Sequence, residues 1–261
     1  MAQDTSEKRL DSDWKSLYKI GGLAALVAAV VFRRNLAAEI GLFTGGQAPA
    51  TVGDWFAMLN SRPLLGLAYL NLFDVVNYVL VGLMFLALYV ALRRTNRGYT
   101  TLATALGFLG IGVYLATNTA LSMLSLSGQY AAATTETQRA ALLGAGDALL
   151  ALGRFTAPGS HPGSGGYVSL LLVALAGLIA SAVMIRSERF NRVTAYVGIL
   201  AGTLDLAYCV AFAFVPAIDR ETLALLFIPA AGLLWVIWHI LVGWRLCQLG
   251  RLAGETPPES A

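Results

Sequence analysis

The feature that most constrains this chain is a succession of apolar runs, each long enough to cross a bilayer. The hydrocarbon core of a bilayer is about 30 Å thick, so a spanning helix needs roughly 20 mainly apolar residues. Runs of about this length lie at 17–33, 65–92, 100–125, 167–185, 193–215 and 223–244. The pattern predicts an all-α protein, a polytopic transmembrane helix bundle of about six spans.

Composition supports lipid as the solvent for most of the chain. Of the 261 residues, 57% are hydrophobic and only 13% are charged, whereas an average soluble domain is about one-quarter charged. So few charged residues cannot cover a water-soluble globule, and we expect one membrane domain. The first run is the weakest, because only 20–32 is uninterrupted. Five spans with a re-entrant first segment therefore remain an open alternative.

The placement of Lys and Arg predicts the orientation. With six spans and a cytoplasmic N-terminus, twelve basic residues face the cytoplasm and six face outward, and the clusters RRTNR (93–97) and RSERFNR (186–192) are both inside. The positive-inside rule then puts both termini in the cytoplasm. We expect a polar cytoplasmic tail at 1–16, the bundle at 17–246 and a second tail at 247–261.

The Arg33–Arg34 pair fits this orientation poorly, because it falls on the outer side. Either its side chains reach the interface, or the first helix runs beyond residue 33.

Two outer loops, 34–63 and 126–166, are long enough to carry structure. The first alternates apolar and polar stretches, which predicts interfacial helices lying on the bilayer with Trp55 and Phe56 as anchors. In the second loop, Thr135 and Gln138 have the spacing of a capping box, which predicts an amphipathic helix over 134–153.

A few polar residues interrupt the apolar runs. An ionisable group in hydrocarbon is costly, so it usually faces the bundle interior and has a partner. Helical spacing puts Asn71, Asp74 and Asn77 (or Tyr78) on one stripe of the second span, and Tyr114, Asn118 and Ser122 on one stripe of the third. The fifth span carries Asp205 and Tyr208.

Depth estimates at about 1.5 Å per residue bring three of these groups to one layer. Asp74, Asn118 and Asp205 would lie slightly outside the midplane. His239 in the sixth span would lie nearer the cytoplasmic face and outside this cluster. Interfacial packing is the favoured role for His239.

These positions predict a polar pocket lined by Asp74, Asn77, Asn118, Asp205 and Tyr208. It would accept a small cationic or polar ligand, or protons. Two neighbouring carboxylates repel each other, so one would readily hold a proton, which suits proton-coupled binding or transport. The alternative for the same residues is structural, since hydrogen bonds across helices would fix the register of the bundle.

Several functions are disfavoured by what the spans lack. Nucleic acid is not an expected partner, because the basic residues sit at the ends of apolar runs. A retinal Schiff base needs a lysine deep in a helix, and none follows Lys19; a bis-histidine haem needs two buried histidines, and His161 is in an outer loop. No cluster is spaced to hold zinc, so we expect neither a cofactor nor a metal.

Two other function classes stay open. One is a non-catalytic partner or assembly subunit whose outer loops dock another protein. The other is an intramembrane enzyme acting on lipid, which would use Asp74 or Asp205 with His239; enzymatic activity is the less favoured of these interpretations.

Three stretches resemble a known family: SLYKIGGLAALVAAVVF, NLFDVVNYVLVGLMFLALYVALRRTN and TAYVGILAGTLDLAYCVAFAF. With the landmarks Asp74 and Asp205, they are similar to a bacterial family of multi-pass membrane proteins, domain of unknown function 4386. The resemblance implies a protein of the bacterial cytoplasmic (inner) membrane. It implies no activity, cofactor or catalytic residue.

Overall fold

The computed structural model describes residues 14–44, 49–153, 163–215 and 220–252, and all regular structure within these ranges is helical. Six helices are long: α2 (Lys15–Thr44), α5 (Leu72–Leu92), α6 (Arg97–Thr117), α9 (Ser164–Met184), α10 (Arg192–Phe214) and α11 (Arg220–Leu252). Four are shorter: α3 (Val52–Ser61), α4 (Pro63–Tyr69), α7 (Ala120–Ala132) and α8 (Glu136–Gly153). The predicted all-α fold class is confirmed.

Five stretches in the described ranges are long and apolar enough to cross a membrane. They are Leu72–Leu92, Arg97–Ala132, Ser164–Met184, Arg192–Phe214 and Leu225–Leu252. The first predicted span, 17–33, lies in α2, which is not one of the five. A multi-pass membrane bundle is therefore established, while the count of six spans stays a prediction.

The helix α2 runs to Thr44, well beyond residue 33. Of the two explanations offered for the Arg33–Arg34 pair, the longer first helix is the one found. Residues 34–44 therefore continue α2, and the separate interfacial helix expected in this part of the first outer loop is wrong.

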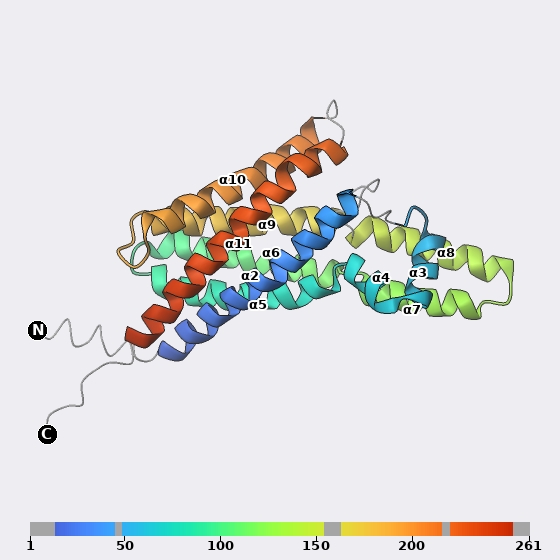
Figure 1. The fold of residues 1–261 in the computed structure, drawn as a ribbon, viewed down its shortest axis with the longest axis horizontal. Helices are drawn as coiled ribbons and strands as arrows, with labels where there is room; N and C mark the ends of the chain where they lie inside the picture. The colour runs from blue at the N-terminus through green and yellow to red at the C-terminus, as the bar shows by residue number, and fades with distance from the viewer. Residues whose placement is uncertain (1–13, 45–48, 154–162, 216–219, 253–261) are drawn as a thin grey trace, which may run out of the picture.

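The long helices pack side by side around one apolar core, as Figure 1 shows. α2 lies along α11 and α5, while α9 lies between α6 and α10. The core contains Met84, Leu88 and Trp238, each at most 1% exposed. Close approach of α2 to α11 depends on small residues: a Cβ at Gly22 would lie 2.8 Å from the backbone nitrogen of Cys247 and 2.9 Å from the carbonyl oxygen of Gly243.

One end of the bundle, which we call the arginine-rich end, gathers the start of α2, the end of α11 and the turns 93–96 and 185–191 (Figure 1). Its parts contact one another. Arg189 donates a hydrogen bond of 2.7 Å to the Tyr18 hydroxyl, and the Arg93 guanidinium lies 5.1 Å from the ring centre of Trp14. Both predicted basic clusters therefore lie at the same end of the molecule.

The opposite end carries α3, α4, α7 and α8, a group that we call the cap (Figure 1). The cap has its own apolar core, in which Trp55 is 1% exposed, Phe56 0% and Met123 0%. The prediction that Trp55 and Phe56 anchor in the bilayer is wrong, because α7 extends beyond α6 and covers the apolar face of α3.

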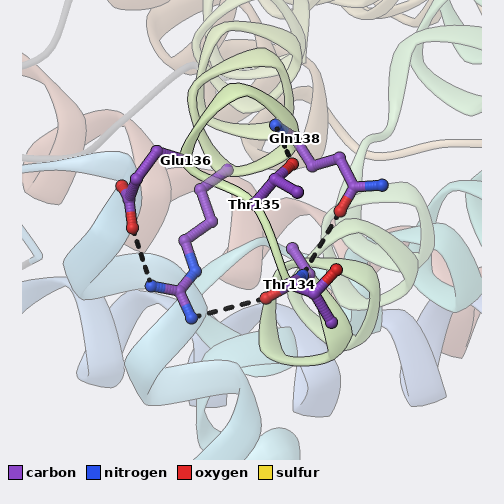
Figure 2. A network of polar contacts seen from close by, with 6 residues as sticks. Thr134, Thr135, Glu136 and Gln138 are labelled. Atoms are coloured by element: carbon purple, nitrogen blue, oxygen red, sulfur yellow. Dashed lines mark hydrogen bonds and ion pairs between the residues drawn. The ribbon is translucent and has the colours of Figure 1, made fainter.

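Two helices of the cap, α3 and α8, begin with side chains that bond to backbone N–H groups of their first turn. In α3, the Thr51 hydroxyl and backbone N–H bond to Asp54, and these bonds hold the pKa of the Asp54 carboxyl below its usual range. At α8, Figure 2 shows the predicted pair: the Gln138 backbone N–H donates to the Thr135 hydroxyl at 3.2 Å. The Gln138 side-chain oxygen accepts from the backbone N–H of Thr134 at 3.3 Å rather than from that of Thr135.

Two predicted spans are interrupted. The run 65–92 divides at Asn71, which has a left-handed backbone with φ of 59° and separates α4 from α5. The run 100–125 divides at Asn118, which ends α6 in an extended conformation. Both breaks lie where the bundle meets the cap. They lie at one end of a cavity inside the bundle.

Candidate functional site

A cavity of about 150 Å³ lies inside the bundle. Its polar lining residues come from four helices and the residue that precedes α5: Asn71, Asp74, Asn77, Tyr78, Tyr114, Asp205, Trp235, Trp238 and His239. Its other lining residues are apolar side chains and glycines, among them Met84, Phe85 and Leu170. None of the lining residues that the structure describes is Lys or Arg.

Three of the five residues predicted for the pocket line this cavity: Asp74, Asn77 and Asp205. They come from two helices, since Asp74 and Asn77 are on α5 and Asp205 is on α10. The structure therefore brings the two intramembrane carboxyl groups to one cavity. Asn118 and Tyr208 do not line it.

Asn118 lies beside the cavity and not in it, because the helix ends there. Its side-chain amide donates to the Asn71 carbonyl oxygen at 3.3 Å, and its oxygen accepts from the backbone N–H of Ala120 at 3.2 Å. The Tyr114 hydroxyl donates to the same Asn71 carbonyl at 3.1 Å. Asn118 thus joins the two helix breaks and holds the cap-side end of the cavity in place.

Tyr208 belongs to a separate apolar cluster near the end of α10. It is 3% exposed and packs with Cys209 and Leu223. Its ring centre lies 6.0 Å from that of Phe212 and 6.5 Å from that of Phe227. Sequence spacing puts Tyr208 one turn from Asp205, but that turn carries it away from the cavity.

The carboxyl group of Asp205 is bound by a residue that sequence reasoning did not include. The indole N–H of Trp235 on α11 donates to Asp205 Oδ2 at 2.6 Å, in a buried environment. One turn further along α11, His239 Nδ1 lies 2.7 Å from the Trp235 carbonyl oxygen. A carbonyl only accepts, so this contact requires a proton on Nδ1.

His239 therefore lies in the same cavity as the carboxyl groups, and the prediction that it lies outside this cluster is wrong. It is 7% exposed. The error came from ending the last span at residue 244, which placed His239 near the end of its helix. In the structure α11 continues to Leu252, so His239 lies further from the helix end. The spacing of Trp235, Trp238 and His239 by three and four residues was the available signal, since it defines one face of a helix.

The carboxyl group of Asp74 is at the third position of α5 and not in the middle of a long helix. The Tyr114 hydroxyl lies 3.5 Å from Asp74 Oδ2. The Tyr114 ring is stacked on that of Tyr78, with centres 4.0 Å apart. These aromatic rings form the wall next to Asp74.

Among the described polar atoms that are buried with no hydrogen-bond partner are Asn77 Oδ1 and Trp238 Nε1. Both residues line the cavity. A buried acceptor or donor without a partner costs roughly 1–3 kcal/mol, so such an atom is usually satisfied by a ligand or an ordered water. Asn77, at 5% exposed, therefore has capacity to bind a group placed in the cavity.

Within the ranges that the structure describes, no three His, Cys, Asp or Glu residues cluster closely enough to hold an ion. The cavity instead combines two carboxyl groups with aromatic and apolar walls.

Fold and cavity together define the class: a multi-pass α-helical membrane protein with an acidic, aromatic-lined pocket inside its bundle. The chain belongs to the family described as domain of unknown function (DUF4386), which it matches over residues 17–243. The resemblance drawn from the sequence is thereby confirmed. Searches of curated proteins and of solved structures found no match.

Proposed function

We propose that this protein binds a small polar or cationic ligand, or protons, in the cavity and acts as a binding or transport protein. One observation carries the proposal: carboxyl groups from α5 and α10 line the same cavity. An acidic side chain inside a membrane bundle is rare and commonly marks a path or site for protons or ions. Two such groups at one cavity suit the binding of a proton or a cation.

Proton movement is the most direct test. The protein is reconstituted in liposomes that contain a pH-sensitive dye, and proton entry is driven by a potassium diffusion potential. We expect wild type to admit protons faster than empty liposomes and Asp74→Asn to abolish most of the difference. Asp147→Asn is the matched control, because Asp147 is exposed on α8 and outside the cavity. Equal rates for wild type and Asp74→Asn would reject proton-linked transport.

An intramembrane enzyme acting on lipid is the second candidate. It is favoured by the presence of His239 in the same cavity as Asp74 and Asp205, since a histidine and a carboxyl group can share general acid–base work. Purified protein would be incubated with bilayer phospholipids and the lipids analysed by mass spectrometry. Product formation that His239→Ala abolishes would support catalysis, and unchanged lipid would reject it.

Docking of another protein through the outer loops is the third candidate, and the cap supports it by giving these loops a defined structure. Changes on the exposed face of α8 should then remove a partner from a pull-down, while cavity substitutions should not. For localisation we propose the bacterial inner membrane, which fractionation of cell membranes would test.

A further inference from the structure

We propose that the arginine-rich end binds the headgroups of anionic phospholipids, and that Arg97, Arg186 and Arg192 are the side chains that hold them. The inference concerns a surface outside the cavity and does not depend on the proposed function. Three features support it in turn: the uncompensated positive charge, the order of side chains along the helices, and the chemistry of the guanidinium group.

The three arginines lie at neighbouring helix ends. Arg97 is the first residue of α6 and Arg192 is the first residue of α10, while Arg186 lies two residues beyond the end of α9. Because α9 packs against both α6 and α10, these ends meet at the arginine-rich end (Figure 1). The fold therefore gathers three positive charges in this part of the surface.

The protein around these arginines does not compensate their charge. All three side chains are exposed, and within the described ranges their guanidinium groups form neither an ion pair nor a hydrogen bond. Glu188 is the acidic residue that the structure describes at this end, and it is not paired with any of them. Such a surface attracts an anion from outside the chain.

The side chains that follow Arg192 identify the anion as a membrane lipid. Tyr196 and Leu200 continue the same face of α10 at intervals of four residues, and both are exposed. A cation, an amphipathic ring and an aliphatic side chain thus follow one another over about 12 Å of helix. Phosphate, glycerol and acyl chain follow in the same order in a phospholipid, and Tyr is enriched at the level between headgroup and hydrocarbon.

Two further helices repeat this order. On α6, Arg97 is followed by the exposed residues Tyr99 and Leu102. On α11, which reaches the same end with its C-terminus, the exposed Trp244 lies two turns before the exposed Arg251. A soluble acidic partner would meet the basic residues alone, whereas a phospholipid also contacts the rings and the aliphatic side chains beyond them.

The charge selects an anionic lipid over a zwitterionic one. A guanidinium group donates paired hydrogen bonds to phosphate oxygens, and every phospholipid has a phosphate. In phosphatidylcholine the choline cation neutralises that phosphate, whereas in phosphatidylglycerol the negative charge has no counterpart. Each basic residue close to an anionic lipid surface should therefore favour phosphatidylglycerol by about fivefold.

The test offers both lipids to the full chain at once. Purified protein in detergent is mixed with equal amounts of phosphatidylglycerol and phosphatidylcholine that have identical acyl chains, and the bound lipids are counted by native mass spectrometry. We expect phosphatidylglycerol to be bound in at least about tenfold excess. Glycerol phosphate, which has the phosphate but no acyl chain, should not displace it at the same concentration.

Substitutions locate the binding. The double variant Arg97→Gln with Arg192→Gln should lower the excess of phosphatidylglycerol by at least about fivefold, and adding Arg186→Gln should lower it further. The matched control is Arg62→Gln with Arg139→Gln, which removes the same charge from exposed residues of the cap and should leave the excess unchanged. Thermal unfolding followed by circular dichroism should show that both double variants are folded, because all four residues are exposed.

Three results would overturn the proposal. Equal binding of the two lipids would show that the charge of this end selects no lipid. An equal loss in the control variant would show that the total charge of the chain, and not the arginine-rich end, attracts the lipid. Displacement by glycerol phosphate would show a site for free phosphate rather than for a lipid.

Discussion

Asp205 is held inside the bundle by a short contact, the 2.6 Å hydrogen bond that the Trp235 indole N–H donates to it. The bond joins α10 to α11 and fixes one carboxyl oxygen at the cavity wall. Trp235 has a second polar contact, because its backbone carbonyl oxygen lies against His239 Nδ1 and orients that ring. The cavity wall and the packing of α10 on α11 therefore share these atoms.

Trp235→Phe should destabilise the protein by about 1–3 kcal/mol, because it leaves a buried carboxyl oxygen without its hydrogen-bond partner. Unfolding in detergent, followed by circular dichroism, measures the loss. The control is Trp244→Phe, since Trp244 is 63% exposed on the same helix. In combination with Asp205→Asn, Trp235→Phe should cost less than it does alone, because the two side chains act as a pair. If Trp235→Phe costs no more than Trp244→Phe, the bond contributes nothing to stability.

The residues that sequence reasoning placed correctly are those whose chemistry is rare in a membrane. Asp74 and Asp205 stand out because an acidic group in an apolar run must face the interior, and Asn77 follows from helical spacing. Asn118 and Tyr208 were assigned by the same spacing. That reasoning failed at Asn118 because it assumed an unbroken helix, and at Tyr208 because spacing alone does not show which neighbouring helix a side chain meets.

At the scale of elements, the helical type and the places of the long helices were predictable and the helix ends were not. Hydropathy located every long helix, but α2 and α11 both extend beyond their apolar runs. The breaks at Asn71 and Asn118 also left no hydropathy signal. They arise from contacts between distant segments, namely the bonds from Tyr114 and Asn118 to the Asn71 carbonyl. Tertiary contacts of this kind cannot be derived from local pattern.

The crossing of α2 over α11 brings backbone atoms of the two helices close together and leaves little room for a side chain. At Gly22 an added Cβ would lie 2.8 and 2.9 Å from backbone atoms of α11, which cannot move without separating the helices. Gly243 is equally confined, since its Cβ would lie 2.9 Å from the Gly22 carbonyl oxygen. Small residues at such a crossing let two membrane helices approach closely.

Gly22→Ala should therefore lower stability by about 1–3 kcal/mol, the usual cost of overpacking. Gly112→Ala is the matched control on α6, because a Cβ there meets nothing within 4 Å. It should be neutral or stabilising by up to about 1 kcal/mol through helix propensity. Both are measured by thermal unfolding in the same detergent. A Gly22→Ala protein as stable as wild type would show that α2 does not pack on α11 as described.

At the scale of the whole molecule, the two ends differ in a way that suits a membrane. The arginine-rich end gathers the turns 93–96 and 185–191, and the cap stands at the other end with a core of its own (Figure 1). The cavity lies between them and begins at the cap, because Asn71, Tyr114 and Gly166 line it and all lie at the cap-side ends of their helices. For the proposed function, this placement predicts that a ligand enters from the side of the cap.

The direction of entry across the membrane then depends on orientation, which labelling with a membrane-impermeant maleimide can measure. Single cysteines replace three exposed residues, Ser16, Thr137 and Glu188, in a chain whose native Cys209 and Cys247 are changed to Ala. With the arginine-rich end in the cytoplasm, Thr137→Cys should react in intact cells. Ser16→Cys and Glu188→Cys should react only after the cells are permeabilised.

Each labelling result that differs from this expectation has its own interpretation, because each pair of sites tests a different part of the topology. Thr137 and Glu188 are separated by one spanning helix, α9, so reaction of both from one side would contradict that span. If Ser16→Cys reacts in intact cells while Glu188→Cys does not, the start of α2 lies outside and the prediction of six spans fails. If all three sites report the reverse orientation, the cavity opens to the cytoplasm, and a ligand drawn from outside the cell could not reach it directly.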